Sequence, residues 1–212
     1  MSTRPDISFA VIATARFVSD PTAAHFLALK RIMRYLRGTR TFGLLYKRDI
    51  TTNCAAYSDA DYAGDEDTRR STTGTVIMMC GAALLWRSRL QKLVTLSTCE
   101  AELVALCETA KDAMWIIELL KNLGMKPGGA FIIHEDNAAA LIVAETGRRK
   151  ARNKHFDVRY FWITDKIKDE VFTLKQCPSK DMLADIFTKP LGTIIFCRLR
   201  TLIGVIDLAV LS

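Results

Sequence analysis

The sequence contains no CxxC pair and no cluster of cysteine and histidine with the spacing of a zinc site, although six cysteines and three histidines are present among its 212 residues. A structural zinc site requires such clusters, so we expect none. Most of the cysteines lie in apolar runs. This placement is typical of small buried hydrophobic residues in a protein of a reducing compartment.

Long apolar stretches are also missing. The longest apolar run near the C-terminus, Leu202 to Leu211, is interrupted by Asp207 and is too short to span a bilayer. Met1 to Asp6 has no apolar core behind its charge, so we do not expect a signal peptide. There is no internal repeat and no low-complexity tract. We therefore expect an intracellular, soluble protein without a membrane partner.

Charge is unevenly distributed along the chain. Half of the residues are hydrophobic and a quarter are charged, as in a globular protein, and the formal net charge is +7. Residues 1–50 carry +6, residues 51–145 carry −5 and residues 146–212 carry +6. This layout fits a polyanion held by the flanks and an acidic centre that needs a cation. A mildly basic protein with solvated charged faces would show the same charge.

Residues 1–50 are predicted to be mostly helical. Asp20-Pro21 is a good helix start and Gly38 a good end. Between them, one face of the expected helix carries regularly spaced apolar residues, namely Phe26, Leu29, Met33 and Leu36. Much of the remaining surface is basic, and two interpretations stay open: a solvated face on a packing helix, or a helix that contacts phosphates.

The middle of the chain predicts strands and then a long helix. Candidate strands are Asn53–Asp59, Thr73–Cys80 and, third, either Leu84–Ser88 or Lys92–Ser97; the short connections favour antiparallel hairpins. The helix is expected at Glu100–Leu123. Its expected core face comprises Leu103, Leu106, Ala110, Ala113 or Met114, Ile117 and Leu120.

The last third alternates strands with helices, which implies parallel pairing. The expected elements are a strand at Ala130–Glu135, a helix at Asn137–Glu145, a basic loop at Gly147–Lys154, a helix at His155–Lys168, a strand at Val171–Gln176 and a helix near Asp181–Thr188. Hairpins followed by such units predict a mixed sheet with helices on it.

Four acids stand among apolar neighbours that fix their backbone. Asp59 ends the first strand, Glu102 lies in the first turn of the long helix, Asp136 ends a later strand, and Asp185 lies on an apolar helix face. Taken singly, each could be a turn, cap or dipole residue. Together they suit phosphodiester hydrolysis, because two divalent ions held by carboxylates can activate water and stabilise the leaving oxygen.

Several ordered motifs make the sequence resemble a known family. The runs are Tyr57-Ser58-Asp59-Ala60-Asp61-Tyr62-Ala63-Gly64-Asp65, Arg69-Arg70-Ser71-Thr72-Thr73-Gly74, Leu96-Ser97-Thr98-Cys99-Glu100-Ala101-Glu102, Glu135-Asp136-Asn137, Lys154-His155-Phe156-Asp157-Val158-Arg159-Tyr160 and Leu183-Ala184-Asp185-Ile186-Phe187-Thr188-Lys189-Pro190. They resemble the ribonuclease H region of copia-type retrotransposon Pol polyproteins, from about residue 55 to 192. Residues 4–48 resemble the C-terminal end of the same family's reverse transcriptase.

The resemblance implies an α/β ribonuclease H-like fold, with a five-stranded mixed sheet flanked by helices and a small, mainly helical N-terminal segment. It divides the chain into a reverse transcriptase thumb or connection remnant at 1–50, a ribonuclease H-like domain at 51–192, and a C-terminal tail or helix at 193–212. It places the metal ligands on Asp59, Glu102, Asp136 and Asp185, with Asp61 and Glu100 as competitors.

The expected cofactor is Mg²⁺ or Mn²⁺, two ions, and the expected activity is hydrolysis of the RNA strand of RNA–DNA hybrids during reverse transcription. Expected partners are the hybrid and reverse transcriptase parts of the same polyprotein. The expected location is the cytoplasm, virus-like particles or the nucleus.

Two departures from the family pattern stand out. Many ribonucleases H carry a histidine just before the last aspartate, and Gln176 to Leu183 contains none. His155 is too early to align there; it either orders the basic loop or meets a phosphate. His134, within a strand, is expected to be structural. The paired aspartates of a polymerase site are absent from the sequence, so we expect no polymerisation.

Two groups of residues are candidates for holding the nucleic acid. Ser58, Ser97, Thr98 and Asn137 lie beside the acids and are expected to bond to sugar 2′-hydroxyls. The basic cluster Arg148, Arg149, Lys150, Arg152 and Lys154, with His155, is expected to contact phosphates. The three tryptophans, Trp86, Trp115 and Trp162, are expected in the core or at an interface.

Two other functions compete with the nuclease. One is a non-catalytic nucleic-acid-binding remnant of a retrotransposon polyprotein. The other is a nuclease or integrase of the same broad fold that acts on duplex DNA with three acids.

Overall fold

The computed structural model describes residues 2–48, 54–125, 130–147 and 154–211, and for 154–160 and 211 it describes the backbone alone. The elements in chain order are η1 (Pro5–Ile7), α1 (Ser8–Ala15), α2 (Ala23–Gly38), β1 (Phe42–Leu44), β2 (Ala55–Asp61), β3 (Thr72–Met79), β4 (Ala82–Leu90), α3 (Thr98–Asn122), β5 (Phe131–Glu135), α4 (Ala138–Thr146), α5 (Lys154–Lys168), β6 (Phe172–Gln176), η2 (Ser179–Asp181), η3 (Leu183–Phe187), α6 (Thr193–Leu202), β7 (Val205–Asp207) and η4 (Leu208–Leu211).

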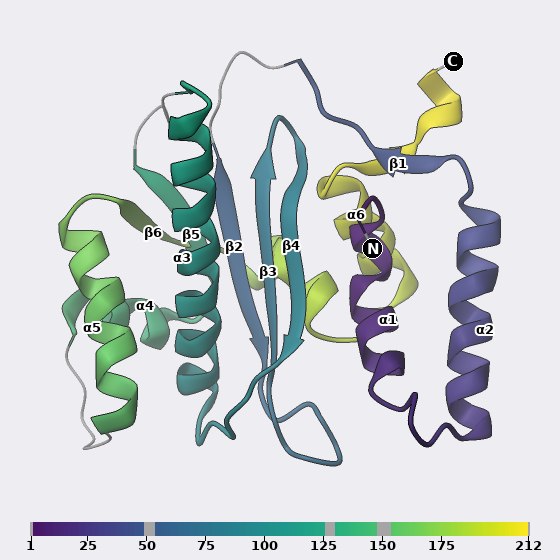
Figure 1. The fold of residues 1–212 in the computed structure, drawn as a ribbon, viewed down its shortest axis with the longest axis horizontal. Helices are drawn as coiled ribbons and strands as arrows, with labels where there is room; N and C mark the ends of the chain where they lie inside the picture. Colours follow the sequence, from purple (N-terminus) through teal and green to yellow (C-terminus); the bar gives the residue numbers. More distant parts are fainter. Residues whose placement is uncertain (1, 49–53, 126–129, 148–153, 212) are drawn as a thin grey trace.

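The main sheet has five strands in the order β4-β3-β2-β5-β6. β2, β3 and β4 pair antiparallel, whereas β5 pairs parallel with both β2 and β6. The turn between β3 and β4 consists of Cys80 and Gly81, both with positive φ, as a two-residue hairpin requires. The predicted five-stranded mixed sheet flanked by helices is therefore confirmed (Figure 1).

One face of the sheet is covered by α3, which crosses in front of it in Figure 1. Small side chains allow the helix to sit close to β2, because Ala56 and Ala60 on the strand meet alanines of the helix. The predicted core face of this helix is buried, from Leu103 and Leu106 to Leu120. This close packing fixes the distance between the N-terminal turn of α3 and the end of β2.

The opposite face is covered by η3, α6 and the C-terminal strand. Phe187 and Ile186 pack with Leu199 and Ile203 against Val76 in a second core cluster. Since side chains alternate along a strand, β2 presents even-numbered residues to α3 and odd-numbered residues to this second cluster. Residues of both faces can therefore meet where β2 ends.

The two ends of the chain contact each other. β1 pairs antiparallel with β7, and the Tyr35 hydroxyl donates to Asp6 at 2.6 Å while accepting from Arg200 of α6 at 3.3 Å. Arg16, just after α1, forms an ion pair of 2.7 Å with the buried Asp65 of the main domain. The division of the chain at residues 50 and 192 stays a prediction.

The structure decides between the two alternatives for the third strand and corrects the last predicted helix. Of the two candidates for the third strand, Leu84–Ser88 lies in β4, whereas Lys92–Ser97 forms no strand. The helix expected at Asp181–Thr188 is two short 3₁₀ segments, which is typical of connections under tight packing. Trp115, expected in the core or at an interface, does not lie in the core, because it is 57% exposed, and a place at an interface stays a prediction.

The expected packing face of α2 is also wrong. Phe26, Leu29 and Met33 are exposed, by 55%, 46% and 60%, and Ile32 is the residue of this helix that is buried. The periodicity correctly predicted a helix, but the residue that α2 buries is Ile32, which lies outside the expected apolar face. Of the cysteines, Cys107 and Cys177 are buried and the other four are half-buried, so the burial expected for most of them holds for two.

The described helices were also tested for membrane crossing. None of those in the described ranges is both long enough and apolar enough for a bilayer.

Gly74 sets the distance between β3 and the segment after η3. A Cβ at this position would lie 2.5 Å from Thr188 Cγ2 and 2.7 Å from the Ala184 carbonyl oxygen. We expect Gly74→Ala to lower the free energy of unfolding by about 1–3 kcal/mol, measured by urea denaturation, because it overpacks a tight contact. The control is Gly38→Ala at the end of α2, where a Cβ meets nothing within 4 Å. Equal stability of Gly74→Ala and the wild type would contradict the close contact.

Candidate metal centre

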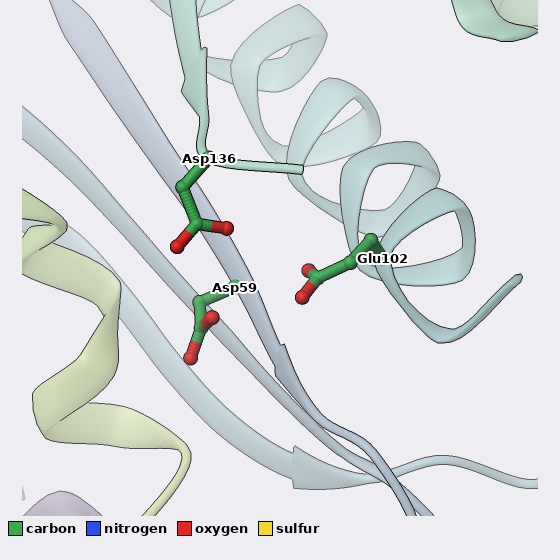
Figure 2. A group of neighbouring side chains, drawn as sticks. All are labelled: Asp59, Glu102 and Asp136. Carbon is green, nitrogen blue, oxygen red and sulfur yellow. The ribbon is translucent and has the colours of Figure 1, made fainter. Parts of the chain in front are cut away.

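The centre lies where β2 and β5 separate. Their parallel pairing ends at Tyr57 and His134, and β5 itself ends at Glu135. Asp59 and Asp136 follow just beyond the paired region, at the carboxyl ends of the two strands. Because parallel strands present these ends at the same edge, the two acids lie next to each other there, and the Asp136 carboxylate points toward Asp59 (Figure 2).

Glu102 reaches the same gap from α3. The helix begins after Ser97, whose hydroxyl accepts a hydrogen bond from the Glu100 amide at 3.2 Å. Glu100 turns back, and its carboxylate accepts from the Leu96 amide at 2.6 Å. Two residues further on, Glu102 projects toward Asp59 and Asp136 (Figure 2). Glu100 therefore completes the helix start, and Glu102 faces the centre.

The described residues contain one group of three acids that could hold a metal ion, namely Asp59, Glu102 and Asp136. One oxygen from each lies within 4.8 Å of the others. Asp59 is 3% exposed and Glu102 is 7% exposed, whereas Asp136 is half-buried. The centre is thus closed toward the sheet and open beside Asp136.

Burial and mutual repulsion disfavour ionisation here. Burial raises the pKa of Asp59 to about 7; Lys189 opposes this rise and Asp185 adds to it. Burial, reinforced by the charges of Glu135, Asp59 and Asp136, raises the pKa of Glu102 to about 11. Lys189 therefore compensates the charge of Asp59 only in part, and no cation is among the main influences on the pKa of Glu102.

The donor set fits a hard divalent cation. All three groups are carboxylates, the ligands that Mg²⁺ and Mn²⁺ prefer. Glu102 Oε2 is buried and has no hydrogen-bond partner among the described residues. A buried, unpaired carboxylate oxygen is costly, and a cation between the three acids would remove that cost.

Asp185 stands beside Asp59 rather than within the group of three. Lys189 Nζ lies 2.8 Å from Asp185 Oδ1 and 3.9 Å from Asp59 Oδ2. The buried Thr188 hydroxyl donates to Asp59 Oδ2 at 2.5 Å. The structure therefore brings the four predicted acids to one edge of the sheet, with Asp185 linked to Asp59 through Lys189. Asp61, half-buried at the end of β2, lies outside the group of three.

Sequence reasoning missed Thr188, Lys189 and Glu135. Lys189 follows Asp185 by four residues, a spacing that places opposite charges on one helical side and could have revealed the pair. Glu135 is fully buried, and one of its oxygens accepts from the Asn137 amide at 3.1 Å. Burial raises its pKa well above the usual value. The available signal was the two-residue period of a strand, which places Glu135 on the same face as the apolar Phe131 and Ile133.

The residues expected to hold the nucleic acid differ in their exposure and in their local roles. Ser58 is fully buried on the face beneath α3, so it is not available to a sugar hydroxyl, and that expectation is corrected. Ser97 and Asn137 cap α3 and α4 through their side-chain oxygens. Thr98 is exposed. His134, expected to be structural, stacks on Tyr57 with ring centroids 4.5 Å apart.

The basic cluster lies outside what the structure describes. Arg148, Arg149, Lys150 and Arg152 fall in an undescribed range, and for Lys154 and His155 only the backbone is described. Their contact with phosphates stays a prediction.

Comparison with curated proteins decides the family. Over 202 residues, 95% of this chain, the sequence is 38% identical to the retrovirus-related Pol polyprotein from transposon TNT 1-94 of Nicotiana tabacum. It is 37% identical over 203 residues, 96% of this chain, to that from transposon RE1 of Arabidopsis thaliana. The chain belongs to the retrovirus-related Pol polyproteins of copia-type transposons. It spans 15% and 14% of the lengths of these two relatives.

Other comparisons are narrower. Over 114 residues, 54% of this chain and 80% of the relative, the sequence is 46% identical to secreted RxLR effector protein 161 of Plasmopara viticola. No family model matches the chain. Among solved structures, LC11-RNase H1, isolated from compost by a metagenomic approach, is similar with a TM-score of 0.50 and 18% identity, over 65% of this chain and 94% of that chain. This likeness confirms the ribonuclease H fold.

The raised pKa values of Asp59 and Glu102 predict how stability depends on pH without metal. A carboxyl group whose pKa is raised in the folded state contributes stability fully below its unfolded value of about 4, and this contribution is lost as the pH rises. Asp59 should lose its contribution up to its folded pKa of about 7, and Glu102 should continue the loss above it. In EDTA, the melting temperature should therefore fall from mildly acidic to mildly basic pH.

Glu102→Gln is the matched variant, since it keeps the shape and removes the charge. We expect it to flatten the fall and to melt at a higher temperature than the wild type at basic pH. Addition of Mn²⁺ should raise the wild-type melting temperature at basic pH, because a bound ion favours the ionised acids. Identical pH profiles for the wild type and Glu102→Gln would contradict the electrostatic description of the centre.

Proposed function

We propose that this chain is a metal-dependent endoribonuclease that hydrolyses the RNA strand of RNA–DNA hybrids during reverse transcription of a transposon. The observation that carries the proposal is the convergence of Asp59, Glu102 and Asp136, with Asp185 beside them, at the open edge of a ribonuclease H fold. Membership of the Pol polyprotein family supports the choice of substrate.

The acids are proposed to hold two ions of Mg²⁺ or Mn²⁺, with Asp59 and Asp185 on one side and Asp59, Glu102 and Asp136 on the other. When bound, such ions supply a nucleophilic hydroxide at neutral pH and neutralise the oxygen that leaves the phosphorus. The fold favours binding of the ions, because an ordered segment already holds each carboxylate in place before an ion binds.

Residues around the acids orient them. Thr188 donates to Asp59 and holds one of its oxygens, so the other can face the centre. The alanine contacts between α3 and β2 keep Glu102 at a constant distance from the strand end. Gly74 leaves room for the segment that carries Thr188. These side chains position the ligands and exclude water from the side of the sheet.

The hybrid is proposed to lie across the open side of the centre, beside Asp136 and the start of α3. Ser97, Thr98 and Asn137 surround this opening and are proposed to contact the bound strands, and the basic residues at 148–154 with His155 are proposed to meet phosphates. The positive flanks of the sequence would favour a polyanion. We also propose that reverse transcriptase parts of the same polyprotein are partners. The proposed location is the cytoplasm, virus-like particles or the nucleus.

Hybrid cleavage tests the proposal. The chain of 212 residues is incubated with a hybrid carrying a label on its RNA strand, in Mg²⁺ or Mn²⁺, and the products are resolved by size. We expect Asp136→Asn to reduce the cleavage rate by more than about a hundredfold, since even residues one step further from a metal often cost 10–100-fold. Asp169→Asn, the same change at an exposed acid of the pair with Lys166, is the control and should cleave as the wild type does.

Three outcomes would contradict the nuclease. They are no cleavage by the wild type, undiminished cleavage by Asp136→Asn, and cleavage of duplex DNA in preference to the hybrid. Salt-dependent binding of the hybrid without any cleavage would instead support the non-catalytic remnant.

A further inference from the structure

Lys189 places a positive charge inside the cluster of acids. Its ammonium lies 2.8 Å from Asp185 and 3.9 Å from Asp59. Within the described part of the chain, no other basic side chain comes within 4.0 Å of Asp59, Glu102, Asp136 or Asp185. Lys189 therefore neutralises one side of the cluster and leaves the other side to oxygen atoms alone.

Asp59 is shared between two cation positions of different kinds. On one side it joins Glu102 and Asp136, with one oxygen from each acid within 4.8 Å of the others. On the other side it faces Asp185 across the Lys189 ammonium. The first position offers only carboxylates to an incoming ion, whereas the second already carries a cation that belongs to the protein.

The backbone holds Lys189 in place while its side chain keeps access to solvent. The preceding Thr188 is buried and bonded to Asp59, and Gly74 allows that segment to approach β3. The Lys189 side chain is nevertheless 39% exposed. Its ammonium lies close to both acids, at 2.8 Å from Asp185 and 3.9 Å from Asp59, so it is their counter-charge in the free protein. A lysine with an anchored backbone and a partly exposed side chain can change partners without unfolding of the protein.

We propose that Lys189 is the resident cation of the Asp59–Asp185 position and that it excludes a second divalent ion until nucleic acid binds. The free protein then takes one divalent ion, on Asp59, Glu102 and Asp136. Moving Lys189 away would leave the buried Asp59 and its neighbour Asp185 without their counter-charge, unless a divalent ion replaces the ammonium.

When nucleic acid binds, a phosphate of the bound strand can replace the acids as the partner of Lys189. It offers the displaced ammonium a new anionic partner, so release of Lys189 and entry of the second ion become linked to substrate binding. This step rests on the proposed function, whereas exclusion of the second ion from the free protein does not.

Metal binding without nucleic acid tests the exclusion. Mn²⁺ is titrated into the metal-free chain, and free Mn²⁺ is followed by electron paramagnetic resonance. We expect the wild type to bind one ion tightly and a second weakly. Lys189→Met should bind the second ion roughly tenfold more tightly, within the usual range for two linked ligands. Lys189→Gln should behave in the same way, and it serves if the methionine variant folds poorly.

Two matched variants separate this effect from general electrostatics. Lys189→Arg keeps a cation at the position and should retain the weak second site. Lys180→Met removes one positive charge from an exposed position before η3 and should leave both affinities as in the wild type. Equal affinity for the second ion in the wild type, Lys189→Met and Lys189→Gln would overturn the proposal. A tight second site in the wild type without nucleic acid would overturn it too.

The hybrid cleavage assay distinguishes failure of this inference from failure of the proposed function. If the wild type cuts the hybrid but binds two ions tightly without nucleic acid, the proposed nuclease function is supported and the proposed role of Lys189 is wrong. If the wild type does not cut the hybrid but Lys189→Met binds a second ion tightly, the nuclease function is wrong and the exclusion of the second ion by Lys189 is supported.

Discussion

The arrangement depends on one electrostatic constraint, which is that several carboxylates converge where the protein gives them little compensation. Glu102 and Asp59 are buried, and their pKa values are raised to about 11 and about 7. Such a cluster disfavours the folded state at neutral pH unless protons or cations neutralise it. The closely packed sheet and helix tolerate this cost because the rest of the core fixes where each acid stands.

The acids come from both sides of the sheet. Glu102 descends from α3, which covers one face, whereas Asp59 lies on the face that η3 and Thr188 cover. They meet because the pairing of β2 with β5 stops before the acids are reached. Small residues are therefore as important here as the acids: alanines bring α3 down to β2, and Gly74 admits the segment that carries Thr188 and Lys189.

Much of this organisation could be predicted from the sequence, since periodicity and motifs are local signals. The long helix follows from its periodicity, and the five-stranded mixed sheet follows from the family resemblance; the structure has both. The strand expected to end at Asp59 continues to Asp61, and β5 ends at Glu135, directly before Asp136. What failed depends on contacts between distant segments. Ser58 sits next to Asp59 in sequence but on the opposite face, and Phe26 of α2 is exposed because Ile32 faces the interior instead. Lys189 acquires its role only when η3 is folded against β2 and β3.

The central claim is that these carboxylates form a cation site, and anomalous X-ray diffraction from crystals grown with Mn²⁺ tests it most directly. The account predicts an anomalous peak coordinated by oxygens of Asp59, Glu102 and Asp136, and loss of that peak in Glu102→Gln. Strong Mn²⁺ peaks elsewhere with none at this edge of the sheet, or carboxylates that point apart in the crystal, would contradict it.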